Sequence, residues 1–133
     1  MTAPRIFVVE DQALVARDIQ TRLISMGYDV LGTASRASDA VSQVLELMPD
    51  LVLMDINLKG EMDGIEAAAR ITEHLDVPII YCTAYSNEAT LARAKITAPY
   101  GYVLKPFDNR ELEINIEISL HKHQMEQEIK LGG

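Results

Sequence analysis

Short apolar segments alternate with longer amphipathic segments along the chain. The short segments are rich in Val, Ile, Leu and Tyr, as is typical of buried strands, and cover residues 5–9, 29–34, 51–54, 77–82 and 101–104. The longer segments carry apolar residues three or four positions apart and predict helices over residues 12–26, 38–47, 65–74, 88–96 and 109 to about 130. Turn signals such as Gly27, Met48-Pro49 and Pro78 separate them.

This alternation predicts an α/β fold with a parallel sheet, because parallel neighbours need a crossover connection and a helix usually supplies it. The strands are almost continuously apolar, which indicates burial on both faces and hence helices on both sides of the sheet. A length of 133 residues suits one domain, and no change in composition marks a second. In such sheets, ligands bind outside the carboxyl ends of the strands.

Charge and cysteine content exclude several other classes of protein. The chain has 12 Lys and Arg against 20 Asp and Glu, a net charge of −8, so bulk charge does not attract it to nucleic acid or to an anionic membrane. We expect neither as a direct partner. No apolar run approaches the roughly 18 residues of a membrane span. The single cysteine, Cys82, cannot form an internal disulfide, lies in a predicted strand as a buried side chain, and fits a cytoplasmic location.

Polar residues follow four of the predicted strands. Glu10 and Asp11 follow the first strand and Asp55 the third. Thr83 and Ala84 lie at the end of the fourth strand, and Lys105 follows the fifth. Because parallel strands end at the same edge of a sheet, we expect these groups to converge there.

Clustered carboxylates repel one another unless a cation is present, and Mg²⁺ prefers oxygen ligands. Asp11 and Asp55 can supply two carboxylates, the backbone carbonyl of Asn57 a third oxygen, and Glu10 can hold a metal-bound water. Lys105 then has a role as a fixed positive charge facing phosphoryl oxygens. Phosphoryl transfer depends mainly on such positioning and charge neutralisation.

In combination, order and spacing, five motifs resemble the receiver domain of two-component response regulators, the CheY-like superfamily, over about residues 4–122. The motifs are Val8-Val9-Glu10-Asp11, Leu51-Val52-Leu53-Met54-Asp55-Ile56-Asn57, Met62-Asp63-Gly64, Thr83-Ala84 and Gly101-Tyr102-Val103-Leu104-Lys105-Pro106-Phe107. The resemblance implies a flavodoxin-like (βα)5 three-layer sandwich with strand order 2-1-3-4-5 and, here, an extended C-terminal helix. The receiver would occupy residues 1–122, and residues 123–133 would extend its last helix.

The resemblance also implies a function as a phosphorylation-dependent signalling switch. The residue matching Asp55 accepts a phosphoryl group from a histidine kinase or phosphotransfer protein. Those matching Asp11 and Glu10 bind Mg²⁺ directly or through water, and those matching Lys105 and Ala84, the latter through its backbone, contact the acyl phosphate. Such a domain is not an enzyme acting on other substrates, because it catalyses only its own phosphorylation and dephosphorylation.

Thr83 and Tyr102 match the switch residues of the family. The resemblance implies that they rearrange on phosphorylation and change the surface formed by the fourth helix, fifth strand and fifth helix. The resemblance further implies a cis peptide bond between Lys105 and Pro106. The chain departs from the common pattern in its Glu10-Asp11 pair, in a loop after Asp55 that is one residue longer and lacks a proline, and in Pro99, which is predicted to end the fourth helix early.

The last predicted helix carries two apolar stripes on nearly opposite sides. An inner stripe comprises Leu112, Ile116 and Leu120, and an outer stripe comprises Ile114, Ile118, Met125 and Ile129. One stripe can pack on the sheet, so we expect the other to serve a homodimer or a coiled linker. His121 and His123 lie two residues apart and do not share a face, so we expect both to be solvated.

Two other functions remain open at this stage. One is an Mg²⁺-dependent phosphohydrolase with an aspartyl nucleophile, similar to the haloacid dehalogenase group, although Asn57 stands where that group has a second aspartate. The other is a degenerate receiver that acts only as a binding module. The sequence leaves undecided the cognate kinase, the output, and whether sensor or kinase domains follow in a longer protein.

Overall fold

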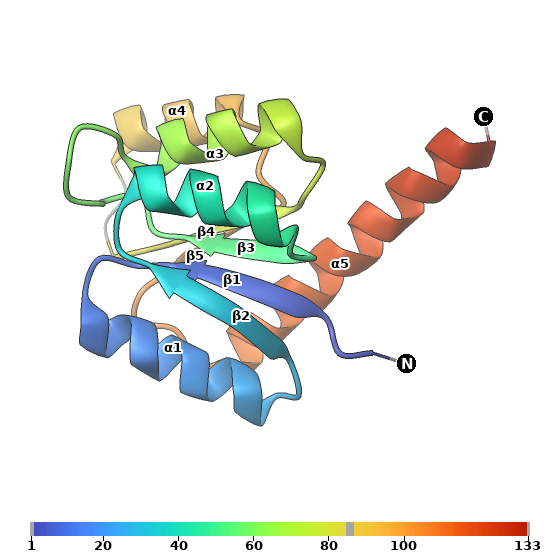
Figure 1. Ribbon diagram of the computed structural model, residues 1–133, viewed down its shortest axis with the longest axis horizontal. Helices are drawn as coiled ribbons and strands as arrows, with labels where there is room; N and C mark the ends of the chain where they lie inside the picture. Colours follow the sequence, from blue (N-terminus) through green and yellow to red (C-terminus); the bar gives the residue numbers. More distant parts are fainter. Residues whose placement is uncertain (1, 85–86, 133) are drawn as a thin grey trace.

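The structure is a computed structural model that describes residues 2–84 and 87–132. Five parallel strands form one sheet in the order β2-β1-β3-β4-β5 (Figure 1). The strands are β1 (Arg5–Val9), β2 (Asp29–Ala34), β3 (Leu51–Met54), β4 (Ile79–Thr83) and β5 (Gly101–Leu104). The helices are α1 (Ala13–Ser25), α2 (Ala37–Leu47), α3 (Gly64–His74), α4 (Glu88–Ile96) and α5 (Asn109–Gly132). This arrangement confirms the predicted flavodoxin-like fold.

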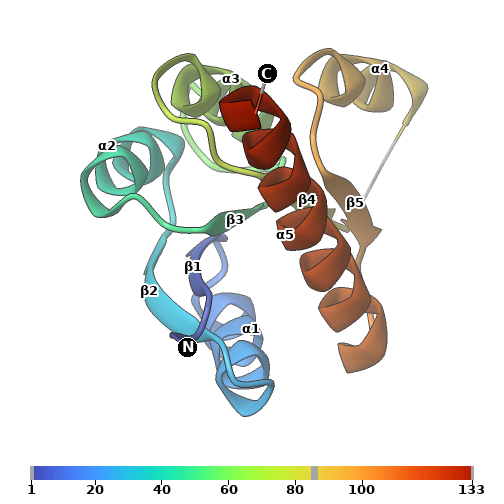
Figure 2. The same cartoon turned by 90° about the vertical axis from the view of Figure 1, so that its right-hand side faces the viewer.

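The sheet lies between two helical layers, with α2, α3 and α4 on one face and α1 and α5 on the other (Figures 1 and 2). Successive strand residues point to opposite faces, so each strand contributes to two separate cores. In β1, Phe7 and Val9 pack under α2 and α3, whereas Ile6 and Val8 pack against α1 and α5. Burial on both faces explains why these strands are almost uniformly apolar.

Some predicted boundaries differ from the structure, and the largest difference is at β4. The pattern predicts a strand over residues 77–82, but β4 begins at Ile79 and includes Thr83. Pro78 has no N–H group to donate to a neighbouring strand, and the N–H of Val77 instead donates to the carbonyl of Leu75 in a tight turn (3.1 Å). Pro99 follows the end of α4 as predicted, after Ala98 with a φ of 51°.

The helix α5 extends beyond the sheet. At about 1.5 Å per residue its 24 residues span roughly 36 Å, so its distal half passes the edge of the sheet (Figure 1). The predicted division into two stripes is confirmed, because Leu112 and Ile116 are fully buried whereas Ile118 is 60% exposed. His121 is exposed as predicted, but the prediction for His123 is wrong, since its side chain is only 20% exposed and contacts Asp76.

Among the residues that the structure describes, no helix is both long and apolar enough to cross a membrane.

Candidate functional site

Three carboxylates meet at the carboxyl edge of the sheet, as predicted. Glu10 and Asp11 follow β1 and Asp55 follows β3, and one carboxylate oxygen from each lies within 4.8 Å of the others. The two strands are neighbours whose register pairs Val9 with Met54, and the N–H of Asp55 donates to the carbonyl of Val9 (2.9 Å). The convergence therefore follows directly from the parallel pairing of β1 and β3.

The carboxylate of Asp55 is buried and held from two sides. Its side chain is 8% exposed. The N–H of Asn57 donates to Oδ1 (3.1 Å), and Nζ of Lys105 lies 3.2 Å from Oδ2. These contacts leave Asp55 at the end of β3 with an ionic partner that comes from the end of β5.

Lys105 makes a second, shorter contact with the carboxylate of Glu10. Burial raises the pKa of Glu10, and the charge of Asp55 raises it further, while hydrogen bonds from Lys105 and from the N–H of Gln12 act in the opposite direction. Burial alone would lower the pKa of Lys105, but the hydrogen bond to Glu10 and the charge of Asp55 raise it. One ammonium therefore stands among three carboxylates, so the pocket favours a further cation.

The third carboxylate, Asp11, is half-buried. It borders an open cavity of about 410 Å³ together with Glu10, Arg17, Thr33 and Ser35. The candidate metal ligands Glu10, Asp11 and Asp55 all offer carboxylate oxygens, which suit a hard divalent cation such as Mg²⁺ better than a soft one. The residues present therefore fit the metal that the sequence pattern predicts.

Thr83 and Lys105 are brought together by the pairing of β4 and β5. The register pairs Thr83 with Leu104, and the N–H of Lys105 donates to the carbonyl of Thr83 (2.9 Å). Thr83 is fully buried, and its hydroxyl accepts a hydrogen bond from the side-chain amide of Asn57 (3.3 Å). Exposed Ala84 follows directly, and the Lys105–Pro106 peptide bond is cis.

Tyr102, the second predicted switch residue, lies in β5 on the face toward α4. Its half-buried ring meets the ring of Tyr81 edge-on, with 6.1 Å between centroids. The hydroxyl of Tyr81 in turn shares a hydrogen bond with Thr97 at the end of α4 (2.6 Å). The end of α4 is thus linked to the two strands that carry Thr83 and Tyr102.

Gly64 closes the loop from Asp55 to α3, a role that the sequence reasoning missed. Its N–H donates to the carbonyl of Ile56 (2.9 Å), and a Cβ at this position would lie 1.9 Å from the backbone oxygen of Asp55. The preceding Asp63 caps α3 by accepting from the N–H of Glu66 (2.9 Å) and pairs with Arg93 of α4 (2.9 Å). A glycine directly after a capping aspartate was the available signal, but only the fold reveals the close approach.

Comparisons with known proteins agree with this geometry. The response regulator receiver domain model matches residues 6–117. The chain is 33% identical to the transcriptional regulatory protein PdtaR of Mycobacterium tuberculosis over 118 residues, which cover 89% of the chain and 57% of that protein. It is 34% identical to the regulatory protein AtoC of Escherichia coli K12 over 127 residues, which cover 95% of the chain and 27% of that protein. The chain thus spans only part of the length of these relatives.

A solved structure gives the same result. The signal receiver domain of a modulated diguanylate cyclase from Desulfovibrio desulfuricans G20 is 40% identical, with a TM-score of 0.89. The match covers 93% of this chain and 98% of that one. Receiver domains are regulatory units of two-component systems, and phosphorylation and Mg²⁺ binding are general features of the family. The chain belongs to the response regulator receiver domain family.

Proposed function

We propose that this chain is a phosphorylation-dependent switch in which Asp55 is the phosphoacceptor. The observation that carries the proposal is the environment of this carboxylate, which is buried at the end of β3 beside Lys105 and close to Glu10 and Asp11. A histidine kinase or a phosphotransfer protein is the donor that fits the family.

In the proposed step, an oxygen of Asp55 attacks the phosphorus of a phosphohistidine in line. The P–N bond breaks, its electron pair returns to the imidazole nitrogen, and an acyl phosphate forms on Asp55. Lys105 supplies a fixed positive charge at the carboxylate, and the buried Thr83 hydroxyl and the backbone of Ala84 are available to the new phosphoryl oxygens.

Mg²⁺ would be held by Asp11, Asp55 and the backbone carbonyl of Asn57, with Glu10 acting through water, and would supply charge neutralisation for the phosphoryl group. Phosphorylation adds about −1.5 to −2 charges at this edge. We infer that Thr83 leaves Asn57 for the phosphoryl group and that Tyr102 moves with it, which changes the surface of α4, β5 and α5.

A homodimer is the assembly that the outer stripe of α5 favours. Ile114, Ile118, Met125 and Ile129 are 41%, 60%, 50% and 70% exposed, which is unusual for four aliphatic side chains along one helix. Sedimentation at high protein concentration, with and without Mg²⁺ and beryllofluoride as a phosphoryl analogue, tests this assembly. We expect a dimer, and a monomer under both conditions would refute it.

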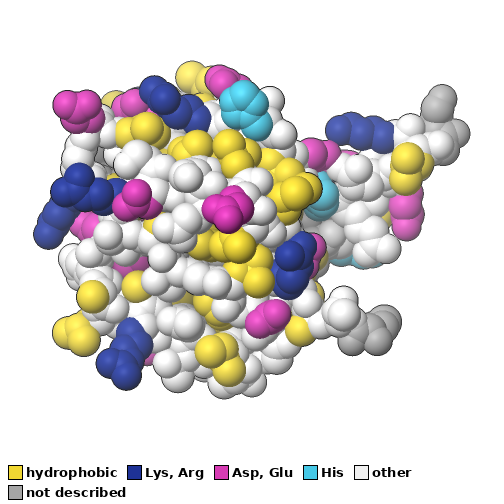
Figure 3. All heavy atoms as spheres, in the orientation of Figure 1, with side chains coloured by type: hydrophobic (Ala, Val, Ile, Leu, Met, Phe, Trp, Pro, Cys, Tyr) yellow, Lys and Arg dark blue, Asp and Glu magenta, His cyan; other side chains and the backbone are white. Residues whose placement is uncertain are grey.

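Nucleic acid and membrane are not proposed as direct partners. The net charge is −8, and on the face seen in Figure 3 the basic side chains are scattered among acidic ones. We infer a cytoplasmic location, a receiver over residues 1–122 and a C-terminal extension over residues 123–133. We infer no catalytic activity beyond the chain's own phosphorylation and dephosphorylation.

Incubation with Mg²⁺ and acetyl phosphate, followed by intact mass and by released phosphate, tests the proposed acceptor. We expect transient addition of one phosphoryl group, which Asp55→Asn abolishes. Asp50→Asn is the matched control, because Asp50 precedes the same strand at the opposite edge of the sheet, and it should leave labelling unchanged. Rapid multiple turnover without a labelled protein would instead support the phosphohydrolase, and absence of both labelling and turnover would support a degenerate receiver.

A further inference from the structure

The distal half of α5, residues 121–131 and here called the arm, passes the edge of the sheet but is tied back to the domain. Its contacts reach two loops, one just before β4 and one just before β5. These contacts lie at the amino ends of the strands, whereas the site of Asp55 lies at their carboxyl ends.

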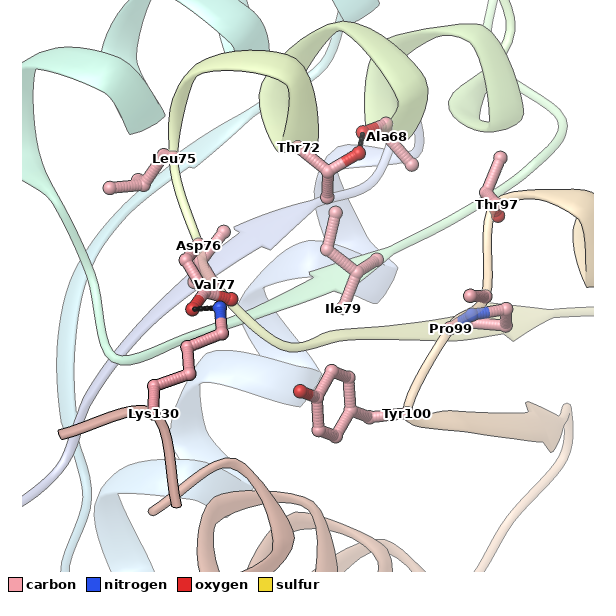
Figure 4. Close-up of a pocket in the computed structure, with 11 residues that line it drawn as sticks. Ala68, Thr72, Leu75, Asp76, Val77, Ile79, Thr97, Pro99, Tyr100 and Lys130 are labelled. Atoms are coloured by element: carbon pink, nitrogen blue, oxygen red, sulfur yellow. Dashed lines mark hydrogen bonds and ion pairs between the residues drawn. The ribbon is translucent and has the colours of Figure 1, made fainter. Parts of the chain in front are cut away.

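The first tie is Asp76, in the loop that precedes β4. Nε2 of His123 lies 3.3 Å from Oδ1 of Asp76 and 3.1 Å from its backbone carbonyl oxygen. The amide of Gln127 donates to Oδ2. Nζ of Lys130 lies 3.4 Å from the same oxygen, and Figure 4 shows this ion pair. Three side chains of one helix therefore converge on a single carboxylate.

The second tie is Tyr100, directly before β5. Its hydroxyl donates to the carboxylate of Glu126. The ring of His123 meets the Tyr100 ring edge-on at 5.8 Å between centroids, and Nζ of Lys122 lies 5.3 Å from the Tyr100 ring centroid. Contacts therefore hold the arm along about three helical turns, from Lys122 to Lys130.

The arm presents the same helix face as the inner stripe. At about 100° per residue, Leu112, Ile116, Leu120, His123, Gln127 and Lys130 fall within a sector about 80° wide. The face is apolar where it crosses the sheet and becomes polar where it crosses the loops. Because this face is held down, the exposed Ile118, Met125 and Ile129 on the other side point away from the domain.

A cavity of about 330 Å³ lies between the arm, the end of α3 and the segment before β5 (Figure 4). Its polar side chains already have protein partners. The hydroxyl of Thr72 donates to the carbonyl of Ala68 (2.9 Å), and the hydroxyl of Thr97 donates to that of Ala94 (2.6 Å). We therefore regard the cavity as space beneath the arm and not as a ligand site.

The electrostatics agree with an ionised carboxylate at the centre of this contact. Burial alone would raise the pKa of Asp76, but hydrogen bonds from Gln127 and Lys130 and the charge of His123 lower it. Among the described residues, the titratable groups that interact with Asp76 are His123 and Lys130 on the arm and Tyr100 before β5, whose pKa is raised by burial and in part by the charge of Asp76.

We propose that Asp76 and Tyr100 form a latch for residues 121–131, which makes the arm a rigid continuation of the domain and fixes the direction of its exposed apolar stripe. Asp76 and Tyr100 lie just before β4 and β5. At their other ends, β4 finishes at Thr83 and β5 is followed by Lys105. The arm opens as one unit when the latch is broken, while the rest of the fold stays closed.

Amide hydrogen exchange of the full chain, analysed by segment, tests the latch. Asp76→Asn removes the charge, Asp76→Ala also removes the acceptor, and Tyr100→Phe removes the hydroxyl alone. We expect exchange over residues 121–131 to be about tenfold faster in Asp76→Ala and several-fold faster in the other two, since each lost contact weakens closing. Residues 109–118 and the strands should be unchanged.

Glu128→Gln is the control on the arm, because Glu128 is exposed and its carboxylate lies outside the latch contacts named above. It should leave exchange at the wild-type rate. Unchanged exchange over residues 121–131 in Asp76→Ala combined with Tyr100→Phe would overturn the proposal. So would acceleration spread evenly over the whole chain, because that result would mean global destabilisation and no separate arm.

Discussion

Replacing Gly64 with alanine is the sharpest test of how the β3–α3 loop positions Asp55. The added Cβ would lie 1.9 Å from the backbone oxygen of Asp55 and 2.9 Å from Cα of Ile56. The first distance is about 1.5 Å short of ordinary van der Waals contact. Both opposing atoms belong to the backbone, so no side-chain rotation can relieve the overlap, and the loop must move.

The free-energy cost of Gly64→Ala follows from this overlap. Forcing extra volume into a packed site costs about 1–3 kcal/mol. At about 4 °C per kcal/mol for a domain of this size, we expect the melting temperature to fall by roughly 4–12 °C. A domain with a typical stability of about 5–15 kcal/mol remains mostly folded after such a loss. A displacement of about 1 Å at the acceptor nevertheless slows phosphoryl transfer about 100-fold.

Two measurements separate the effects. Thermal unfolding followed by circular dichroism reports stability, and intact mass after addition of Mg²⁺ and acetyl phosphate reports the rate of labelling at a temperature where the variant is folded. Gly32→Ala is the matched control, because a Cβ there meets only the Phe7 ring at an ordinary 3.4 Å. Wild-type melting and labelling in Gly64→Ala would refute the argument that this contact positions Asp55.

Three further predictions follow from other contacts. Asp63→Ala removes the cap on Glu66 and the ion pair with Arg93 and should cost about 1 kcal/mol in chemical denaturation, whereas Asp63→Asn keeps a capping oxygen and should cost less; equal losses would contradict this assignment. Burial, aided by nearby carboxylates, raises the pKa of Tyr28 to about 12. The protonated Tyr28 therefore contributes its full stability to the fold below pH 10, and this contribution is lost as the pH rises through 12. Ultraviolet titration of Tyr28→Phe against wild type should show one fewer late-ionising tyrosine. Burial also raises the pKa of the Cys82 thiol to about 12, so a thiol reagent should label it only as fast as the protein unfolds, and prompt labelling of native protein would count against that.

The sequence alone predicted the elements and the edge of the sheet that carries the site. Runs such as residues 51–54 are recognisable because burial on both faces excludes polar residues from a central strand. The meeting of Glu10, Asp11 and Asp55 was predictable because parallel strands end together, and no knowledge of exact packing is needed for that step. The motifs also identified the family.

Tertiary structure decided the contacts between side chains that are distant in sequence. Local patterns gave no indication that Gly64 approaches the backbone of Asp55, because that contact depends on how the loop closes. The same holds for His123, which lies 47 residues from Asp76 and was expected in solvent. Hydrophobic periodicity specifies which face of α5 packs on the sheet, but the length and angle at which the helix passes the sheet edge determine which loops its polar residues meet.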